Sequence, residues 1–369
     1  MLTLGIKLTD EQQAFILAAA LLHDVGHGPF SHAFEKVTGD NHETRTLEVI
    51  QDSTTEIHRR LVAFHPSFPQ QLGMFFDEDW EAPSAGEIIP SFLTELVSSQ
   101  LDGDRFDYLL RDSHATGTEY GRFDRDWIIA HLYLDDHKGA PRFFVSSKAF
   151  LPTEAYIFAR YHMYRTVYFH KATRAAEVML KLLFQRFKEV VADNSPSLFP
   201  AQSEQFPTAI ANAFRGHLSL ADYLDLDDFA LSEFFKSCER CNDGILRELG
   251  HGLLHRRLYK AIELSDRESN VVAEFRTALD HALREAGADM AFHFGVDTPA
   301  DTPYKPYDPD DDKPAAQIYV QSSAGRIVEI STISNPVDEL KKKYQLTRYY
   351  YPPRFRDEVA SVARSTLSS

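Results

Sequence analysis

Cysteine is scarce in this chain of 369 residues, which contains only Cys238 and Cys241. Two cysteines cannot build the disulfide framework that holds many small secreted proteins together. His251 and His255 follow them, and this spacing faintly resembles that of a zinc finger. The apolar side chains of residues 245–254 recur at helical spacing, however, so we predict a continuous helix and a structural role for the cysteines.

Long apolar runs are also lacking, because no stretch approaches the roughly 18 apolar residues that a membrane-spanning helix needs. Met1 is followed by neither the basic nor the apolar segment of a cleavable leader. The composition, 43% hydrophobic and 25% charged, is typical of a globular chain with a sizeable core. We therefore expect a folded, enzyme-sized cytoplasmic protein with no membrane partner.

Basic residues are outnumbered, since 39 Lys and Arg stand against 55 Asp and Glu and leave a formal net charge of −16. This balance argues against broad nucleic-acid binding, because an acidic surface repels the phosphate backbone. Any phosphate-bearing ligand then needs a local basic pocket, which suits a nucleotide better than a duplex. We expect no sequence-specific nucleic-acid partner.

One stretch, residues 21–43, is by contrast rich in histidine and carboxylate. A helical run with one apolar face leads into His23 and Asp24, and Gly26 and Pro29 end the helix. Imidazole and carboxylate both bind divalent metals, and a bound metal can make hydroxide near neutral pH while neutralising phosphate charge. Neighbours on a helix diverge by about 100°, so both side chains can share one ion only if other elements complete its shell.

Two further segments carry polar side chains at helical spacing. The first has an acidic and phenolic stripe, made of Asp104, Tyr108 and Asp112. The second, a helix expected over about 152–191, has a basic and phenolic strip made of Arg160, Tyr164, Tyr168 and Lys171. Guanidinium groups match phosphate geometry, and tyrosines pack against sugar or base. A solvated face and a core helix with long polar side chains remain the alternative explanations.

The run His-Asp-Val-Gly-His-Gly-Pro-Phe-Ser-His, which begins at His23, resembles the HD-domain phosphohydrolases, in particular their deoxynucleoside triphosphate triphosphohydrolase branch. The resemblance is strong from about residue 21 to 171 and weak in the C-terminal third. It implies metal ligation by His23, Asp24 and Asp104. It implies catalytic roles for His27, His32, Glu35 and His42. It implies substrate contacts from Arg105, Tyr108, Asp112, Arg160, Tyr164, Tyr168 and Lys171.

The activity that this resemblance implies is hydrolysis at the α-phosphorus of a deoxynucleoside triphosphate, which releases a deoxynucleoside and inorganic triphosphate. A divalent ion (Mg, Mn, Fe or Zn) would present the water. His32, oriented by Glu35, is the candidate general acid for the 5′-oxygen, while His27 and His42 would stabilise charge on the α-phosphate.

Two alternative functions stay open. One is another HD phosphohydrolase activity, on a nucleoside monophosphate, a cyclic nucleotide or an alarmone. The other is a nucleotide-binding regulatory module with impaired catalysis. Because some relatives bind regulatory nucleotides, the basic cluster at 255–260 is also a candidate second nucleotide site.

We expect a mainly α fold, with an HD-domain helical core, a short β-hairpin and a smaller α+β C-terminal part, assembled as a homo-oligomer. The hairpin is expected from strands at 127–135 and 142–146, and helices are expected elsewhere in the core, apart from a loose segment at 66–86. Asn41 is the expected N-cap of a helix that begins at His42, and 348–351 is expected as a final strand. The expected divisions are 1–191 for the HD phosphohydrolase core, 192–207 for a linker, 208–296 for a helical region, 297–317 for a loop rich in Pro and Asp, and 318–369 for a small α+β element.

The family resemblance also implies a further metal-ligating histidine on a helix well before His23, yet none of the 22 preceding residues is a histidine. We therefore expect that the chain is an N-terminally shortened form that hydrolyses deoxynucleotides poorly. Its metal affinity should be reduced at least as much as by the loss of supporting groups around a ligand, which costs about 10- to 100-fold. Metal analysis of the purified chain beside a triphosphate-release assay checks this. Stoichiometric, tightly held metal with robust turnover would contradict it.

Overall fold

The computed structural model describes residues 7–76, 91–137, 140–192, 198–199, 206–215, 218–299, 317–340 and 346–367. The chain forms two compact units, each assembled from three separate segments. The first unit comprises Met1–Gly26, Thr46–Tyr168 and Asp301–Tyr344. The second comprises His27–Arg45, Phe169–Ala300 and Gln345–Ser369. Residues 1–191, expected as one core, thus contribute to both units.

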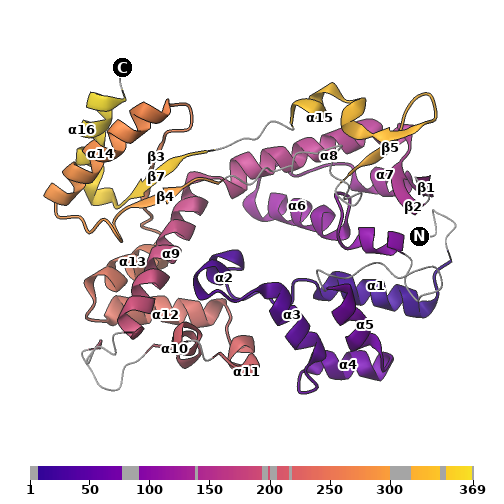
Figure 1. Cartoon of the computed structure of the whole chain (residues 1–369), viewed down its shortest axis with the longest axis horizontal. Helices are drawn as coiled ribbons and strands as arrows, with labels where there is room; N and C mark the ends of the chain where they lie inside the picture. Colours follow the sequence, from indigo (N-terminus) through magenta and orange to yellow (C-terminus); the bar gives the residue numbers. More distant parts are fainter. Residues whose placement is uncertain are drawn as a thin grey trace. The chain divides into compact units, whose positions relative to one another are not determined.

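The expectation of a mainly α fold is confirmed, as the labelled helices in Figure 1 show. The helices of the first unit are α1 (Asp10–Leu22), α4 (Glu56–Phe64), α5 (Phe68–Phe75), η2 (Ser91–Leu96), α6 (Gly103–Thr116), α7 (Arg125–Ala130), η3 (Ser147–Ala149), α8 (Phe150–Met163), η4 (Tyr164–Tyr168), η6 (Ile330–Thr332) and α15 (Asn335–Glu339). Helix α3 (His42–Gln51) begins in the second unit and ends in the first.

The other helices of the second unit surround the long helix α9. They are α2 (His32–Thr38), α9 (Lys171–Ala192), α10 (Thr208–Arg215), α11 (Leu220–Leu224), α12 (Asp228–Arg240), α13 (Gly244–Leu254), α14 (Ser269–Glu285), η7 (Pro353–Phe355) and α16 (Arg356–Thr366). None of the described helices is both long enough and apolar enough to cross a membrane.

Each unit contains one small sheet. The first has the order β1-β2-β5-β6, from β1 (Leu132–His137), β2 (Ala140–Val145), β5 (Tyr319–Gln321) and β6 (Ile327–Glu329). Strand β2 pairs antiparallel with β1 and parallel with β5, where Val145 faces Val320. The second has the order β3-β7-β4, from β3 (Lys260–Glu263), β7 (Arg348–Tyr351) and β4 (Gly295–Asp297). Segment 318–369, expected as one element, therefore supplies strands to both sheets.

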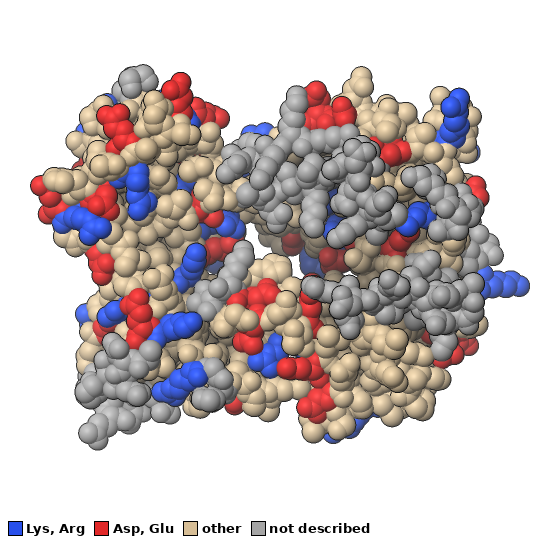
Figure 2. Space-filling view, viewed as in Figure 1, with Lys and Arg blue, Asp and Glu red and all other residues tan. Residues whose placement is uncertain are grey.

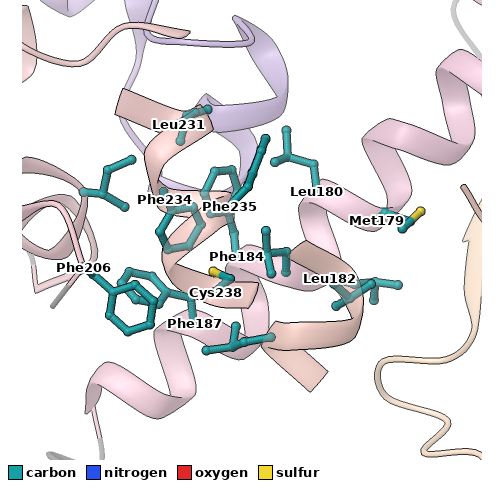
Figure 3. Close-up of a cluster of buried hydrophobic side chains, with 14 of the residues drawn as sticks. Met179, Leu180, Leu182, Phe184, Phe187, Phe206, Leu231, Phe234, Phe235 and Cys238 are labelled. Carbon is teal, nitrogen blue, oxygen red and sulfur yellow. The ribbon is translucent and has the colours of Figure 1, made fainter. Parts of the chain in front are cut away.

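The largest apolar cluster lies in the second unit, between α9 and the helices α10, α12 and α13. Figure 3 shows Phe184 and Phe187 of α9 lying against Phe234 of α12, with Cys238 among them. The rings of Phe187 and Phe234 are 4.8 Å apart and nearly edge to face. Burial of such side chains supplies most of the driving force for packing the unit.

Several local predictions are confirmed. The side chain of Asn41 accepts a hydrogen bond from Thr44 N at the start of α3, as expected of an N-cap. Strands β1 and β2 form the expected hairpin, and β7 has the expected bounds. Most of 192–207 and 297–317, with Pro83, Ser84 and Gly86, lies outside the described residues.

Two local predictions are wrong. Residues 125–130, whose apolar run favoured a strand, form helix α7, because the Asp124 side chain caps its first turn through Trp127 N. The loose segment expected from Pro66 onward contains helix α5, in which Pro69 occupies the first turn, where a missing N–H costs nothing.

The helix expected over 152–191 is interrupted. Helix α8 ends at Met163, residues 164–168 form a π-helical turn, and α9 begins only at Lys171. The turn contains the β-branched pair Thr166 and Val167, which have low helix propensity, and π turns are frequent at functional sites. Lys171 consequently begins a different helix, in the other unit, from Arg160.

The continuous helix expected over residues 245–254 is confirmed as α13, which Asp243 caps, while α12 ends at Arg240, just before Cys241. The structural role expected for the cysteines is consistent with their complete burial. Burial raises the pKa of both thiols, which keeps them protonated.

The loop between α1 and α2 holds a strained backbone. Phe30 and Ser31 have φ of 57° and 50°, a region that non-glycine residues rarely adopt. The Phe30 ring lies against Phe235, with 6.3 Å between centroids, and this contact helps to hold the loop. Gly28 also lies close to buried side chains, since a Cβ there would be 3.0 Å from the Phe34 ring and 3.1 Å from the Tyr223 hydroxyl.

We expect Ser31→Gly to raise the free energy of unfolding or to leave it unchanged. Glycine relieves a backbone strain worth about 1–3 kcal/mol in the folded state, and the greater freedom of glycine in the unfolded chain offsets only part of this gain. Gly28→Ala should lower it. Urea denaturation followed by circular dichroism checks both. A Ser31→Gly variant destabilised by more than about 1 kcal/mol would contradict the expectation.

Candidate active site

Helix α1 delivers His23 to the first unit's candidate metal site. The helix starts with a capping box, in which Thr9 and Gln12 each accept a hydrogen bond from the other's backbone N–H, both at 3.1 Å. It ends at Leu22, so His23 is its C-cap. The His23 Nδ1 atom lies 3.0 Å from the Ala20 carbonyl oxygen, which can only accept, so Nδ1 carries the proton and Nε2 is left to bind.

Two carboxylates face this Nε2 atom. Asp24 Oδ2 lies 3.5 Å and Asp104 Oδ1 4.0 Å from it, although 80 residues separate the two aspartates in sequence. Burial raises the pKa of Asp104, His23 opposes the rise, and Asp102 and Asp24 add to it. One imidazole and two mutually repelling carboxylates are a donor set that a divalent cation fits, so the residues expected to ligate metal do lie together.

A buried threonine supports this arrangement. The Thr46 hydroxyl donates to the His23 carbonyl oxygen at 3.2 Å and accepts from Gly26 N at 2.9 Å. It therefore holds both ends of the turn that carries Asp24. Sequence reasoning missed Thr46, whose only signal was its position four residues after His42, on the same face of α3.

The second unit brings together the four expected catalytic side chains, His27, His32, Glu35 and His42. Glu35 bridges two of the rings: Oε2 lies 2.9 Å from His32 Nδ1, and Oε1 lies 3.0 Å from His42 Nδ1. The His42 backbone N–H also donates to Oε1, at 3.2 Å. The His27 ring stacks on His42, with 4.0 Å between centroids.

The charge of Glu35 determines which ring nitrogen of His32 and His42 donates to it. Burial by itself raises its pKa, but hydrogen bonds from His32 and His42 outweigh burial and lower the pKa to about 2. An ionised carboxylate only accepts, so each ring donates from Nδ1 and keeps Nε2 for chemistry. The ligand atoms of all four side chains lie within 4.8 Å of one another, so this group could also hold a metal ion.

A pocket of about 540 Å³ opens beside His27 within the second unit. It is lined by the loop from His27 to Ser31 and by Leu226 to Phe229. Phe229 is largely exposed and Phe30 about half exposed, so aromatic faces form part of its wall. Such faces suit stacking against a planar ring.

The first unit contains most of the expected substrate-contacting residues. Tyr168 donates a 2.5 Å hydrogen bond to Asp112, which joins the π-helical turn to α6. Burial, and then this bond to Asp112, strongly raise the pKa of the Tyr168 hydroxyl, which keeps it a donor. Tyr164 packs edge to face on Tyr168, at 4.9 Å, and Tyr108 lies 6.4 Å away. These four side chains therefore form one cluster.

The two arginines expected to contact substrate have protein partners. Arg160 is only 4% exposed, and its Nη1 donates to Gln100 Oε1 at 2.7 Å. Arg105 pairs with the buried Asp102, which also caps α6 by accepting from Arg105 N at 2.7 Å. Sequence reasoning missed both Gln100 and Asp102 as partners. Lys171 is exposed at the start of α9.

Charges of both signs are interspersed over the face of the described residues drawn in Figure 2. In the cluster at 255–260, Tyr259 is buried and Lys260 begins β3. Its role as a second nucleotide site stays a prediction.

Comparisons with known proteins identify the family. Residues 1–75 match the HD domain. The uncharacterised protein YwfO of Bacillus subtilis is 33% identical over 344 residues, which cover 93% of this chain and 74% of YwfO. A deoxynucleoside triphosphate triphosphohydrolase SAMHD1 homolog of Dictyostelium discoideum is 28% identical over 47% of this chain, which spans 34% of that protein.

The fold is shared with a solved phosphohydrolase from Bacteroides thetaiotaomicron, BT4208. The TM-score is 0.74, at 24% identity, and the similarity covers 95% of this chain and 83% of the other. With the His23, Asp24 and Asp104 arrangement in place, these similarities show that the chain belongs to the HD-domain phosphohydrolase family.

Proposed function

We propose that this protein hydrolyses deoxynucleoside triphosphates to deoxynucleosides and inorganic triphosphate in a metal-dependent reaction. The observation that carries the proposal is the pair of imidazoles, His32 and His42, that Glu35 holds with both Nε2 atoms left for chemistry. Family membership supports a hydrolase activity. The similarity to the Dictyostelium triphosphohydrolase supports the choice of substrate.

His23, Asp24 and Asp104 are the residues that would hold the metal. When bound there, a divalent ion would lower the pKa of water and offset the charge of the phosphates. His23 can bind through Nε2 without changing its hydrogen bond to Ala20. Asp104, whose pKa burial raises, gains most from a neighbouring positive charge.

The leaving 5′-oxygen requires a proton, and we assign its delivery to His32. Its side chain is 63% exposed, whereas that of His42 is only 17% exposed, so His32 is the more accessible of the two rings that Glu35 holds. In the proposed step an oxygen–phosphorus bond forms from water to the α-phosphorus as the bond from phosphorus to the 5′-oxygen breaks. His32 acts in its protonated form: it keeps the Nδ1–H bond to Glu35 and gives the Nε2 proton to that oxygen, and the proton that the attacking water loses passes to solvent. His27 and His42 stabilise charge on the phosphate.

The cluster on α6 and the π-helical turn would contact sugar and base. Asp104, Tyr108 and Asp112 are spaced by one turn each, so the stripe extends for about 12 Å along α6 from the metal-ligating carboxylate. Tyr168 and Asp112 offer a donor and an acceptor beside aromatic faces. Arg105, Arg160, Tyr164 and Lys171 stay proposals for phosphate or nucleoside contact.

Product analysis tests this function. The chain is incubated with each deoxynucleoside triphosphate and Mn²⁺ or Mg²⁺, and the products are resolved by ³¹P NMR and chromatography. Intact triphosphate with deoxynucleoside is expected. Release of pyrophosphate or orthophosphate, or turnover only of a monophosphate, a cyclic nucleotide or an alarmone, would replace the proposal by another HD activity. Thermal stabilisation by nucleotide without any product would favour a regulatory module.

We expect His32→Ala to lower kcat by about 10²- to 10⁴-fold with little change in nucleotide binding, because a general acid acts on the leaving group in the transition state. His281→Ala is a matched control, since His281 forms an exposed pair with Glu285 at 3.3 Å, on α14. Triphosphate release and equilibrium nucleotide binding are measured for both variants. Equal turnover of the His32 variant and the wild type would remove His32 from the mechanism.

A further inference from the structure

Helices α12 and α13 approach each other unusually closely. The contact is made at Gly250, where an added Cβ would lie 2.8 Å from Cys238 Cβ and 3.0 Å from the Phe235 carbonyl oxygen. Gly250 and Cys238 are both buried, and Figure 3 places Cys238 within the core of the second unit. Each of these residues is followed by one with a metal-binding side chain, Glu239 on α12 and His251 on α13.

The close approach brings three ligating side chains together. Oε1 of Glu239 lies 2.5 Å from His251 Nδ1 and 3.0 Å from His255 Nε2. The two rings are one helical turn apart, with 4.3 Å between centroids. The three ligand atoms all lie within 4.8 Å of one another.

The electrostatics of the cluster suit a cation. Hydrogen bonds from His251 and His255 lower the pKa of Glu239, so its carboxylate is ionised. Both histidines lie at the C-terminal end of α13, where the helix dipole favours positive charge. Of the nearby cations, Lys236 and Arg240 are paired with Glu233, and Arg256 and Arg257, which follow His255, are exposed to solvent.

We propose that Glu239, His251 and His255 form a binding site for a zinc-like divalent metal, with water as the fourth ligand. Metal–ligand distances of about 2.0–2.2 Å in a tetrahedral shell separate the ligand atoms by about 3.3 Å. The two distances from the carboxylate oxygen, 2.5 and 3.0 Å, would therefore widen by about 0.8 and 0.3 Å when an ion enters. Two imidazoles and one carboxylate are a donor set that zinc uses elsewhere.

This site differs from the zinc-finger spacing in the sequence. The histidines take part, but Glu239 replaces the cysteines, whose thiols are buried and protonated. It also shares no residue with the group around His23. A metal at this position would cross-link α12 to α13, and its effect is therefore on the stability of the second unit.

Metal counting tests the proposal on the full chain. Chelator-treated protein is titrated with Co²⁺, and bound metal and visible absorption are recorded for the wild type, for the His251→Gln/His255→Gln double variant and for the matched control His281→Gln. The wild type and the control should bind one equivalent more than the double variant, with absorption typical of tetrahedral Co²⁺. His255→Gln alone should weaken this equivalent by at least 10-fold.

Thermal melting separates metal loss from misfolding. Zn²⁺ should raise the melting temperature of the wild type by more than that of the double variant, which keeps the other candidate metal groups, and should still raise that of Asp24→Asn. The three should melt within a few degrees of one another without metal. Glu239→Gln, which keeps a hydrogen-bond acceptor, should respond like the double variant. Equal metal content and equal Zn²⁺ response in the wild type and the double variant would overturn the site and leave only a hydrogen-bonded cluster.

Discussion

The carboxylate of Glu35 is the group on which the candidate catalytic cluster most depends. It accepts from two imidazole rings and from one backbone N–H, and these bonds join the first turn of α2 to the start of α3. Without them, His32 and His42 would lose both their orientation and the assignment of their protons. The strained residues Phe30 and Ser31 are tolerated because this network anchors helix α2, which begins directly after them.

The surroundings shift the pKa of the candidate metal ligand Asp104 in the opposite direction from that of Glu35. Glu35 has all the partners it needs from the protein, and its pKa is correspondingly low. Burial, followed by the nearby Asp102 and Asp24 carboxylates, raises the pKa of Asp104, although His23 and Arg105 oppose the rise. Glu35 therefore positions the two rings that donate to it, whereas Asp104 is a carboxylate that a bound cation would stabilise.

Local signals in the sequence were sufficient to predict the features that depend on residues close together in the chain. The end of α1 at His23, the Asn41 cap and the β1–β2 hairpin all depend on contacts within a few residues. The partner of Arg160 could not be predicted, because Gln100 lies 60 residues away and no periodicity links them. The parallel pairing of β2 with β5 joins residues 175 positions apart, and it likewise required the fold.

The strand β7 lies in the middle of its sheet, although it comes almost last in the chain. It supplies the hydrogen bonds for both β3 and β4, so neither of these strands has its sheet partner until residues 348–351 have been synthesised. On the ribosome, the second unit must therefore wait with two unpaired strands and the apolar face of α14 uncovered. Its folding therefore requires that synthesis has passed residues 348–351, and until then the unpaired strands are open to aggregation.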